Sequence, residues 1–357
     1  MLKRLRFIIL FSLGAACSGL AEKPVRSGGR EQIPEWATNV VKSLEFGVLL
    51  EVEASLSDAA GRSESDIILA TAAFDFEASF SEWLVGHVGL LWEQYDTEEN
   101  NLDEAFITLH AHNEIPLYFL AGRFYLPVGK FESVFISDPL TLELAEIHKS
   151  AAMIGYDGQW MQLGAGMFNG DVKEGVPIGD DGDSTIEDAY AAVSITPCEG
   201  VQFGCYWLSD LMESDAQAEL GEELAQEAGY EKHGGAGAFA HIHMGPLTLN
   251  AEYVSAIGEY DLVDGRYAPD ALHLEAAIQL CEKCTVGLKY ENSSDLFATR
   301  STAPLSFADK YPGEVTGLAV VYALYKNTTV SAEYLHVEDL DNNERGDAVT
   351  VQLALQI

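Results

Sequence analysis

Apolar and polar side chains alternate with a period of two along most of the chain, from about residue 45 to the last residue. Successive side chains of a β-strand point to opposite faces, so this period predicts strands with one apolar and one polar face. The first segment sets six apolar positions against polar or small ones: Phe46, Val48, Leu50, Val52, Ala54 and Leu56 against Glu45, Gly47, Glu51, Glu53 and Ser55, with Leu49 as the apolar exception. The last segment repeats the pattern with Val349, Val351, Leu353, Leu355 and Ile357 on one face.

About sixteen strands are predicted when every such segment is counted. Between the first and the last they fall near residues 67–80, 84–95, 102–112, 117–126, 149–157, 159–168, 187–196, 201–211, 234–244, 247–257, 270–281, 285–293, 315–325 and 328–338. Tight turns alternate with mostly longer, acidic loops, and the turns lie at residues 81–82, 157–158, 197–200, 245–246, 281–284 and 326–327.

This pattern predicts an all-β fold, a transmembrane antiparallel β-barrel of about sixteen strands. Bacterial outer-membrane barrels have short turns in the periplasm and long loops outside, and their apolar strand faces meet lipid. A soluble β-sandwich or propeller is the alternative, but neither needs this asymmetry of the connectors, and no repeat of blade length recurs.

The N-terminal residues predict export from the cytoplasm. Lys3, Arg4 and Arg6 precede an apolar run, and small residues follow near Ala21, as in a secretory signal peptide. We therefore expect a signal peptide at 1–21, a short periplasmic arm at 22–43 and an outer-membrane barrel at 44–357. No later run is long and apolar enough for a transmembrane helix.

The charge of the chain is strongly negative, at −37 over 357 residues. This excludes nucleic acid as a partner, because phosphate backbones bind basic surfaces. At 48% hydrophobic and 10% aromatic residues, the chain is nevertheless expected to fold.

If the apolar faces meet lipid, the opposite faces line a water-filled lumen that is mainly acidic. The predicted lumen acids are Glu51, Glu53, Asp75, Glu77, Glu93, Glu104, Asp188, Glu252, Glu275, Glu291 and Glu333, and the clearest basic candidates are Arg123 and Lys289. Such a lumen favours cations over anions. The alternative is that each acid only keeps the wall wet.

The segment from Leu126 to Lys149 differs from the other loops because it mixes apolar residues with spaced charges. Its charges include Lys130, Glu132, Asp138, Glu143 and Glu146. A long amphipathic loop is usually packed or functional, so we expect either a constriction inside the barrel or packing on its rim. Residues 213–231 have a helical, acidic composition, and we expect a short surface helix there, within an outer loop.

Four passages resemble the LbtU-type siderophore porin family: residues 47–54 (GVLLEVEA), 65–71 (SDIILAT), 121–129 (AGRFYLPVG) and, most specific, 136–144 (ISDPLTLEL). The resemblance is best in the N-terminal half. It implies a sixteen-stranded barrel that admits an iron-chelating siderophore without an energy-coupling plug. Some members have a longer N-terminal extension, whereas residues 22–43 allow only a short arm here.

Cys198, Cys205, Cys281 and Cys284 remain after removal of the signal peptide. An even number in an oxidising compartment suggests disulfides, and pairing within each hairpin is the simplest arrangement. We predict neither a metal site nor a cofactor, although His110, His112, His241 and His243 could face the lumen.

The sequence contains no G-x-S-x-G or H-E-x-x-H motif, so we predict a channel in the bacterial outer membrane rather than an enzyme. The expected function is passive, cation-preferring transport, with siderophore uptake as the specialised form and a general porin for small nutrients as the alternative. A barrel enzyme is the third hypothesis. The expected partners are outer-membrane lipid and small solutes, and a homo-oligomer such as a trimer is left open.

Overall fold

The computed structural model describes residues 41–59, 62–94, 101–111, 115–172, 186–218, 221, 231–262, 265–294, 312–339 and 345–357. The predicted signal peptide, most of the N-terminal arm and His112 lie outside the described residues. No helix in the described part of the chain is long and apolar enough to cross a membrane.

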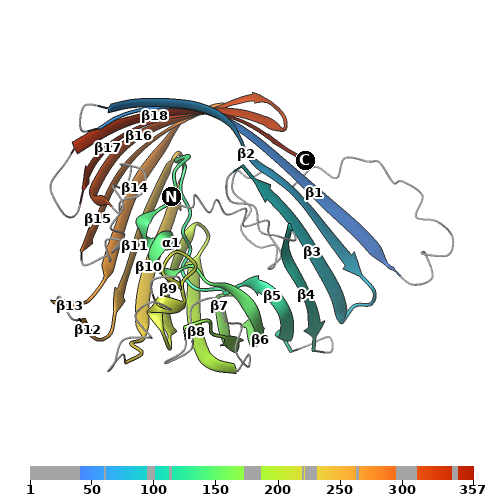
Figure 1. Ribbon diagram of the computed structural model, residues 1–357. Coiled ribbons are helices and arrows are strands. Elements are labelled where there is room, and N and C mark those ends of the chain that lie inside the picture. The colour runs from blue at the N-terminus through green and yellow to red at the C-terminus, as the bar shows by residue number, and fades with distance from the viewer. Residues whose placement is uncertain are drawn as a thin grey trace.

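Sixteen antiparallel strands form one closed barrel, which confirms the predicted fold (Figure 1). They are β1 (Ser43–Ala59), β2 (Arg62–Ser79), β3 (Leu84–Glu93), β4 (Leu102–His110), β5 (Leu117–Tyr125), β6 (His148–Asp157), β7 (Met161–Asn169), β8 (Ile186–Cys198), β9 (Val201–Leu208), β10 (Gly235–Met244), β11 (Leu247–Ala256), β14 (Asp270–Cys281), β15 (Cys284–Ser294), β16 (Pro312–Tyr325), β17 (Thr328–Asp339) and β18 (Arg345–Gln356). Each strand pairs with its neighbours in chain order, and β1 pairs with β18 to close the ring.

Besides the wall strands, the described residues form several short elements. A small hairpin of β12 (Tyr260–Leu262) and β13 (Gly265–Tyr267) interrupts the connection between β11 and β14. The helix α1 (Leu140–Ala145) lies within the connection between β5 and β6, and a single 3-10 turn (Leu211–Glu213) follows β9. The hairpin is too short for its strands to show a period that a sequence pattern can detect.

The register places the predicted apolar faces on the outside. The apolar side chains of Phe46 and Leu56 in β1 and of Val351 in β18 are exposed. Glu53 and Gln352, which point to the opposite face of these two strands, are buried, and the Gln352 side chain donates a 3.0 Å hydrogen bond to Glu53. Unpaired backbone groups are not tolerated in hydrocarbon, so ring closure satisfies every strand edge and lets the apolar band face lipid.

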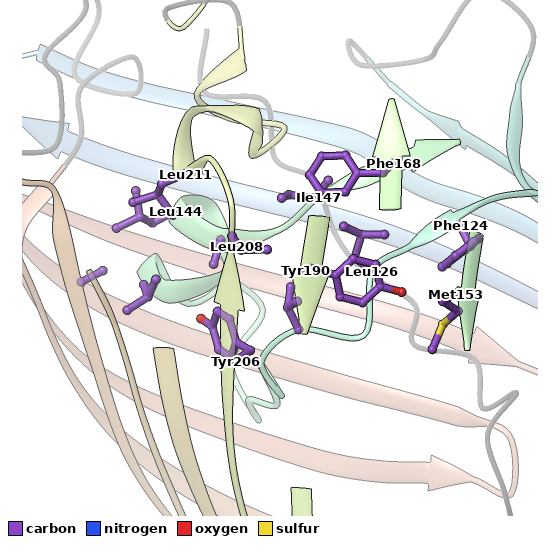
Figure 2. Close-up of a cluster of buried hydrophobic side chains, with 14 of the residues drawn as sticks. Phe124, Leu126, Leu144, Ile147, Met153, Phe168, Tyr190, Tyr206, Leu208 and Leu211 are labelled. Carbon is purple, nitrogen blue, oxygen red and sulfur yellow. The ribbon is translucent and has the colours of Figure 1, made fainter. Parts of the chain in front are cut away.

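The inner face of β5 to β9 departs from the expected polar lumen. It carries a buried cluster that includes Met153, Phe168, Tyr190, Tyr206 and Leu208 (Figure 2). Tyr118 and Leu120 of β5 belong to the same cluster. Apolar side chains inside a barrel need a partner, and here the partner is the connection between β5 and β6 (126–147), which we call the inner loop. Its residues Leu126, Leu144 and Ile147 complete the cluster.

Candidate functional site

The inner loop runs inside the ring of strands instead of projecting outward (Figure 1). Its helix α1 contacts β11, β14 and β15, and Leu142, Leu144 and Ala145 of the helix are buried. Burying one such side chain is worth about 1.5–3 kcal/mol relative to exposure, so packing on the wall offsets the entropy of ordering the loop.

Wall carboxylates bind the backbone of the loop tip. Glu252 of β11 accepts hydrogen bonds from the backbone N–H groups of Lys130 at 3.1 Å and Phe131 at 2.9 Å. Glu275 of β14 accepts from the Ser133 hydroxyl at 2.6 Å and from the Val134 N–H at 3.2 Å. Phe131 has a left-handed backbone with φ of 49°. That conformation is uncommon for a bulky residue and persists only where contacts such as these hold it.

Two further carboxylates bind the next part of the loop. One oxygen of Glu333 in β17 accepts from the N–H groups of Ile136 at 2.8 Å and Ser137 at 3.0 Å. Glu291 of β15 accepts from the N–H of Leu140 at 3.0 Å. These donors precede or begin α1, so the carboxylates satisfy backbone groups that a loop inside a barrel would otherwise leave unpaired.

Nine of the eleven acids predicted for the lumen fall into two groups. The other two, Glu93 and Asp188, are also buried, and Asp188 pairs with Lys232 at 3.0 Å. Glu252, Glu275, Glu291 and Glu333 are all buried and engaged by the inner loop. They lie on the inner face, as predicted, but the loop covers them, so they do not line an open passage. Lys289, predicted as a lumen cation, pairs with Glu291 at 3.0 Å and donates to the Ser137 hydroxyl at 2.8 Å.

The second group lies on β1 to β4, across the ring from the strands that hold the loop tip. The side chains of Glu51, Glu53, Asp75, Glu77 and Glu104 lie on the inner face there, and Glu53 is buried whereas the other four are partly exposed. In strand order β3 is eight places from β11, which is half of the ring.

The charged residues of the inner loop are in different environments. Lys130 and Glu132 form an ion pair at 2.9 Å, and the exposed Glu132 also lies 3.2 Å from the Nδ1 of His241. Asp138 and Glu143 are partly buried, and Glu146 is buried. Arg123, predicted to line the pore, lies in β5 opposite Ala105 and Ser150 and donates from Nε to Nε2 of His148 at 3.4 Å.

A second segment, after β9, also packs inside the barrel. Leu211, Met212, Glu213, Ser214 and Gln217 are all buried. The predicted surface position of the helix over residues 213–231 is therefore wrong for its described beginning, because Leu211 and Met212 just before it are apolar and draw the segment into the core. Ala218 and Gly221 do have a helical backbone. Residues 219–220 and 222–230 lie outside the described residues.

The second inserted segment meets the end of the inner loop and the start of β6 at Asp215. The Asp215 N–H donates to the Glu146 carbonyl oxygen at 2.9 Å, and the Asp215 carboxylate accepts from the His148 N–H at 3.1 Å. Burial raises the pKa of Asp215 to about 7, against the lowering effect of Lys149, and burial raises the pKa of Glu213 to about 7. Burial, reinforced by Asp215 and other acids, raises the pKa of Glu146 well above its ordinary value. This contact therefore favours protonated carboxyl groups.

The histidine pair of β10 has protein partners. His241 Nδ1 lies 2.7 Å from the Asn250 side-chain oxygen, and His243 Nδ1 lies 3.0 Å from the Thr248 hydroxyl. Among the described residues, no group of three or more His, Cys, Asp or Glu side chains is arranged to hold a metal ion.

The four cysteines are free thiols in this structure. Cys281 and Cys284 are register partners across the turn between β14 and β15, so their pairing stays a prediction. A Cys198–Cys205 bond is wrong, because Cys205 pairs with Val193, five residues or about 16 Å along β8 from Cys198. Cys205 is exposed in β9 together with Phe203 and Trp207.

No family model matches the chain. It is similar to a UPF0422 protein of Coxiella burnetii (strain RSA 493 / Nine Mile phase I), with 22% identity over 296 residues, which are 78% of this chain and 60% of that protein. The chain thus spans only part of the length of this relative. A second similarity, to the UPF0422 protein lpl2888 of Legionella pneumophila (strain Lens), is 26% over 105 residues, which are 27% of this chain and 20% of that one.

Solved structures show the same fold. The outer membrane channel DcaP of Acinetobacter baumannii aligns with a TM-score of 0.63 at 12% identity, over 88% of this chain and 97% of that one. An anion-selective porin from Comamonas acidovorans aligns with a TM-score of 0.61 at 10% identity, over 88% of this chain and 99% of that one. The chain therefore has the closed-barrel fold of these outer-membrane channels. Its closed wall and apolar outer band place the protein in the bacterial outer membrane.

Proposed function

We propose that this protein is a passive outer-membrane channel for small solutes, narrowed by the inner loop and selective for cations. The observation that carries the proposal is the asymmetry of charge inside the barrel. The acids under the loop are engaged by backbone N–H groups, by Lys289 or by both, whereas four acids on β1, β2 and β4 remain partly exposed: Glu51, Asp75, Glu77 and Glu104.

Basic side chains around the inserted segments do not offset the acids of β1 to β4. Lys289 pairs with Glu291 at 3.0 Å, Lys232 pairs with Asp188 at 3.0 Å, and Lys149 pairs with Asp171. A passage with one charged wall and low-dielectric surroundings concentrates counter-ions of the opposite sign. The expected counter-ions here are cations.

Planar bilayer recording tests the channel and its selectivity together. Purified protein is expected to produce discrete conductance steps, and a salt gradient is expected to give a reversal potential of the sign for cation preference. Absence of conductance steps would contradict the proposal of a channel. Clear steps with anion preference would contradict only the proposed cation selectivity.

Siderophore uptake is the specialised form of this proposal and is supported by the resemblance of residues 136–144 and the other three passages. A direct test is uptake of a neutral ferric hydroxamate chelate into liposomes that contain the protein, compared with a neutral sugar of similar size. Faster entry of the chelate supports specialised uptake. Equal rates would favour a general porin for small nutrients.

A further inference from the structure

The wall across the ring from the strands that hold the loop tip contains a group of side chains whose hydrogen-bonding capacity is only partly used among the described residues. His87 of β3 lies between Asp75 of β2 and Glu104 of β4. Its Nε2 is 3.6 Å from Asp75 Oδ1 and 3.7 Å from Glu104 Oε2, which is too long for a hydrogen bond. Among the described residues, no Lys or Arg forms an ion pair with either carboxylate.

His87 is held rigidly although Nε2 lacks a hydrogen-bond partner. Its side chain is only 5% exposed, and the imidazole stacks on Phe106 with ring centroids 4.7 Å apart and planes inclined by 14°. Buried polar nitrogens are normally hydrogen-bonded, and Nε2 has no partner among the described residues. An unused nitrogen aimed at two carboxylates points to a ligand that donates to all three.

Glycine preserves the space between the two carboxylates. Gly89 is the register partner of Asp75, and a Cβ there would lie 3.2 Å from Asp75 Oδ1 and 3.5 Å from the Cβ of Glu104. Both carboxylate side chains are about one-fifth exposed, so they are accessible from the lumen. Glu104 has one oxygen engaged by the Tyr125 N–H at 3.3 Å, which leaves the other directed at His87.

We propose that Asp75, His87 and Glu104 form a binding subsite for a primary ammonium group on solutes that pass through the channel. An ammonium group carries three N–H donors and a positive charge. The site offers two carboxylate oxygens and the imidazole nitrogen Nε2 as acceptors. Both oxygens lie within 3.7 Å of Nε2. The proposal rests on the proposed channel function and adds a ligand class, primary amines and diamines.

The test uses block of the potassium current in planar bilayers by 1,4-diaminobutane. Its bis(trimethylammonium) analogue has the same charge but no N–H donors, and it is expected to block only at concentrations at least about tenfold higher, because hydrogen bonds to charged groups are lost. Equal block by the two compounds would show general attraction by the acidic wall and overturn the subsite.

Asp75→Asn and Glu104→Gln are each expected to raise the half-blocking concentration of the diamine by about tenfold or more. Glu82→Gln removes the same charge from an exposed side chain in the turn between β2 and β3 and serves as the matched control. Gly89→Ala keeps every charge and is expected to weaken the block by filling the space. Diamine block that is unchanged in Asp75→Asn and Glu104→Gln would overturn the proposal.

His87→Phe separates the subsite from a simple ion pair. Phenylalanine keeps the ring stacked on Phe106 and removes the acceptor nitrogen, so the subsite predicts weaker diamine block. If His87 is instead a protonated counter-ion of the two acids, its removal increases the negative charge and block becomes tighter, which would overturn the proposal. Absent or anion-selective conductance in the wild type counts against the proposed function. Normal cation selectivity without preference for the diamine counts only against the subsite.

Discussion

At the scale of single residues, carboxylates with the same apparent position in a strand have different roles. Glu333 and Glu53 both alternate with apolar neighbours and both lie on the inner face, but Glu333 binds the backbone of the inner loop and Glu53 accepts from Gln352 of the adjacent wall strand. The period of two determines the face of each acid. It contains no information about the partner on that face.

The buried carboxyl of Asp215 makes docking of the two inserted segments depend on pH. Its pKa is raised from 3.8 to about 7, mainly by burial, so the folded state holds a proton that the unfolded state releases. The stability from this group is therefore complete below pH 3.8 and is lost as pH rises through about 7.

Asp215→Asn is expected to remove that part of the pH dependence and to be more stable than the wild type at pH values above about 7. Unfolding midpoints in detergent, recorded from acid to mildly alkaline pH, measure the effect. Asp58→Asn, an exposed carboxylate at the same end of the barrel, is the control. Parallel pH profiles for the wild type and Asp215→Asn would contradict the expectation.

At the scale of elements, the strands could be predicted from the sequence but the path of the inner loop could not. The sequence offered two alternatives for residues 126–149, a constriction or a loop packed on the rim. A signal in favour of the interior was present in β5 and β6, where Leu120 and Met153 make the inner face apolar as well. Strands that are apolar on both faces inside a polar barrel mark the wall on which a loop packs.

Gly129 makes the tip of the inner loop possible. Its φ is +71°, and a Cβ there would lie 2.6 Å from Glu252 Oε1 and 2.2 Å from the Phe131 ring. Gly129→Ala is expected to displace the tip from Glu252 and to increase conductance in planar bilayers.

Gly245→Ala provides the matched control for backbone strain. Gly245 has a φ of +59° in the turn between β10 and β11, with nothing within 4 Å of the added Cβ. Alanine at this position therefore has the cost of a left-handed backbone, about 1 kcal/mol, but its Cβ makes no clash. Equal conductance in the two variants would count against a docked loop tip.

At the scale of the whole molecule, closure of the ring converts an amphipathic pattern into a membrane protein. β1 and β18 are the first and last strands of the described chain, and they pair from Leu49 with Gln356 to Ala59 with Gly346. That pairing removes both sheet edges, which would be unsatisfied in lipid. Every outward apolar face then contributes to one continuous band.

If this apolar band contacts lipid, a charged substitution should destabilise the barrel much more on the outer face of β18 than on its inner face. Val351→Arg places a charge on the exposed apolar face near the middle of the strand and is expected to destabilise the barrel by about 2–4 kcal/mol. Ala354→Arg places the same side chain on the inner face opposite Glu51, where a much smaller loss is expected. Urea unfolding in lipid vesicles measures both, and similar losses would argue against lipid on the outer face.

The sequence alone determined the class of fold, the strands and the face of most side chains, because contact with lipid imposes a strict period of two on each strand separately. The tertiary structure decided which acids remain accessible. The hydrogen bonds from Phe131 to Glu252 and from Ile136 to Glu333 join residues 121 and 197 positions apart. Such contacts depend on how the ring closes and where a loop turns inward, and neither event leaves a periodic trace in the chain.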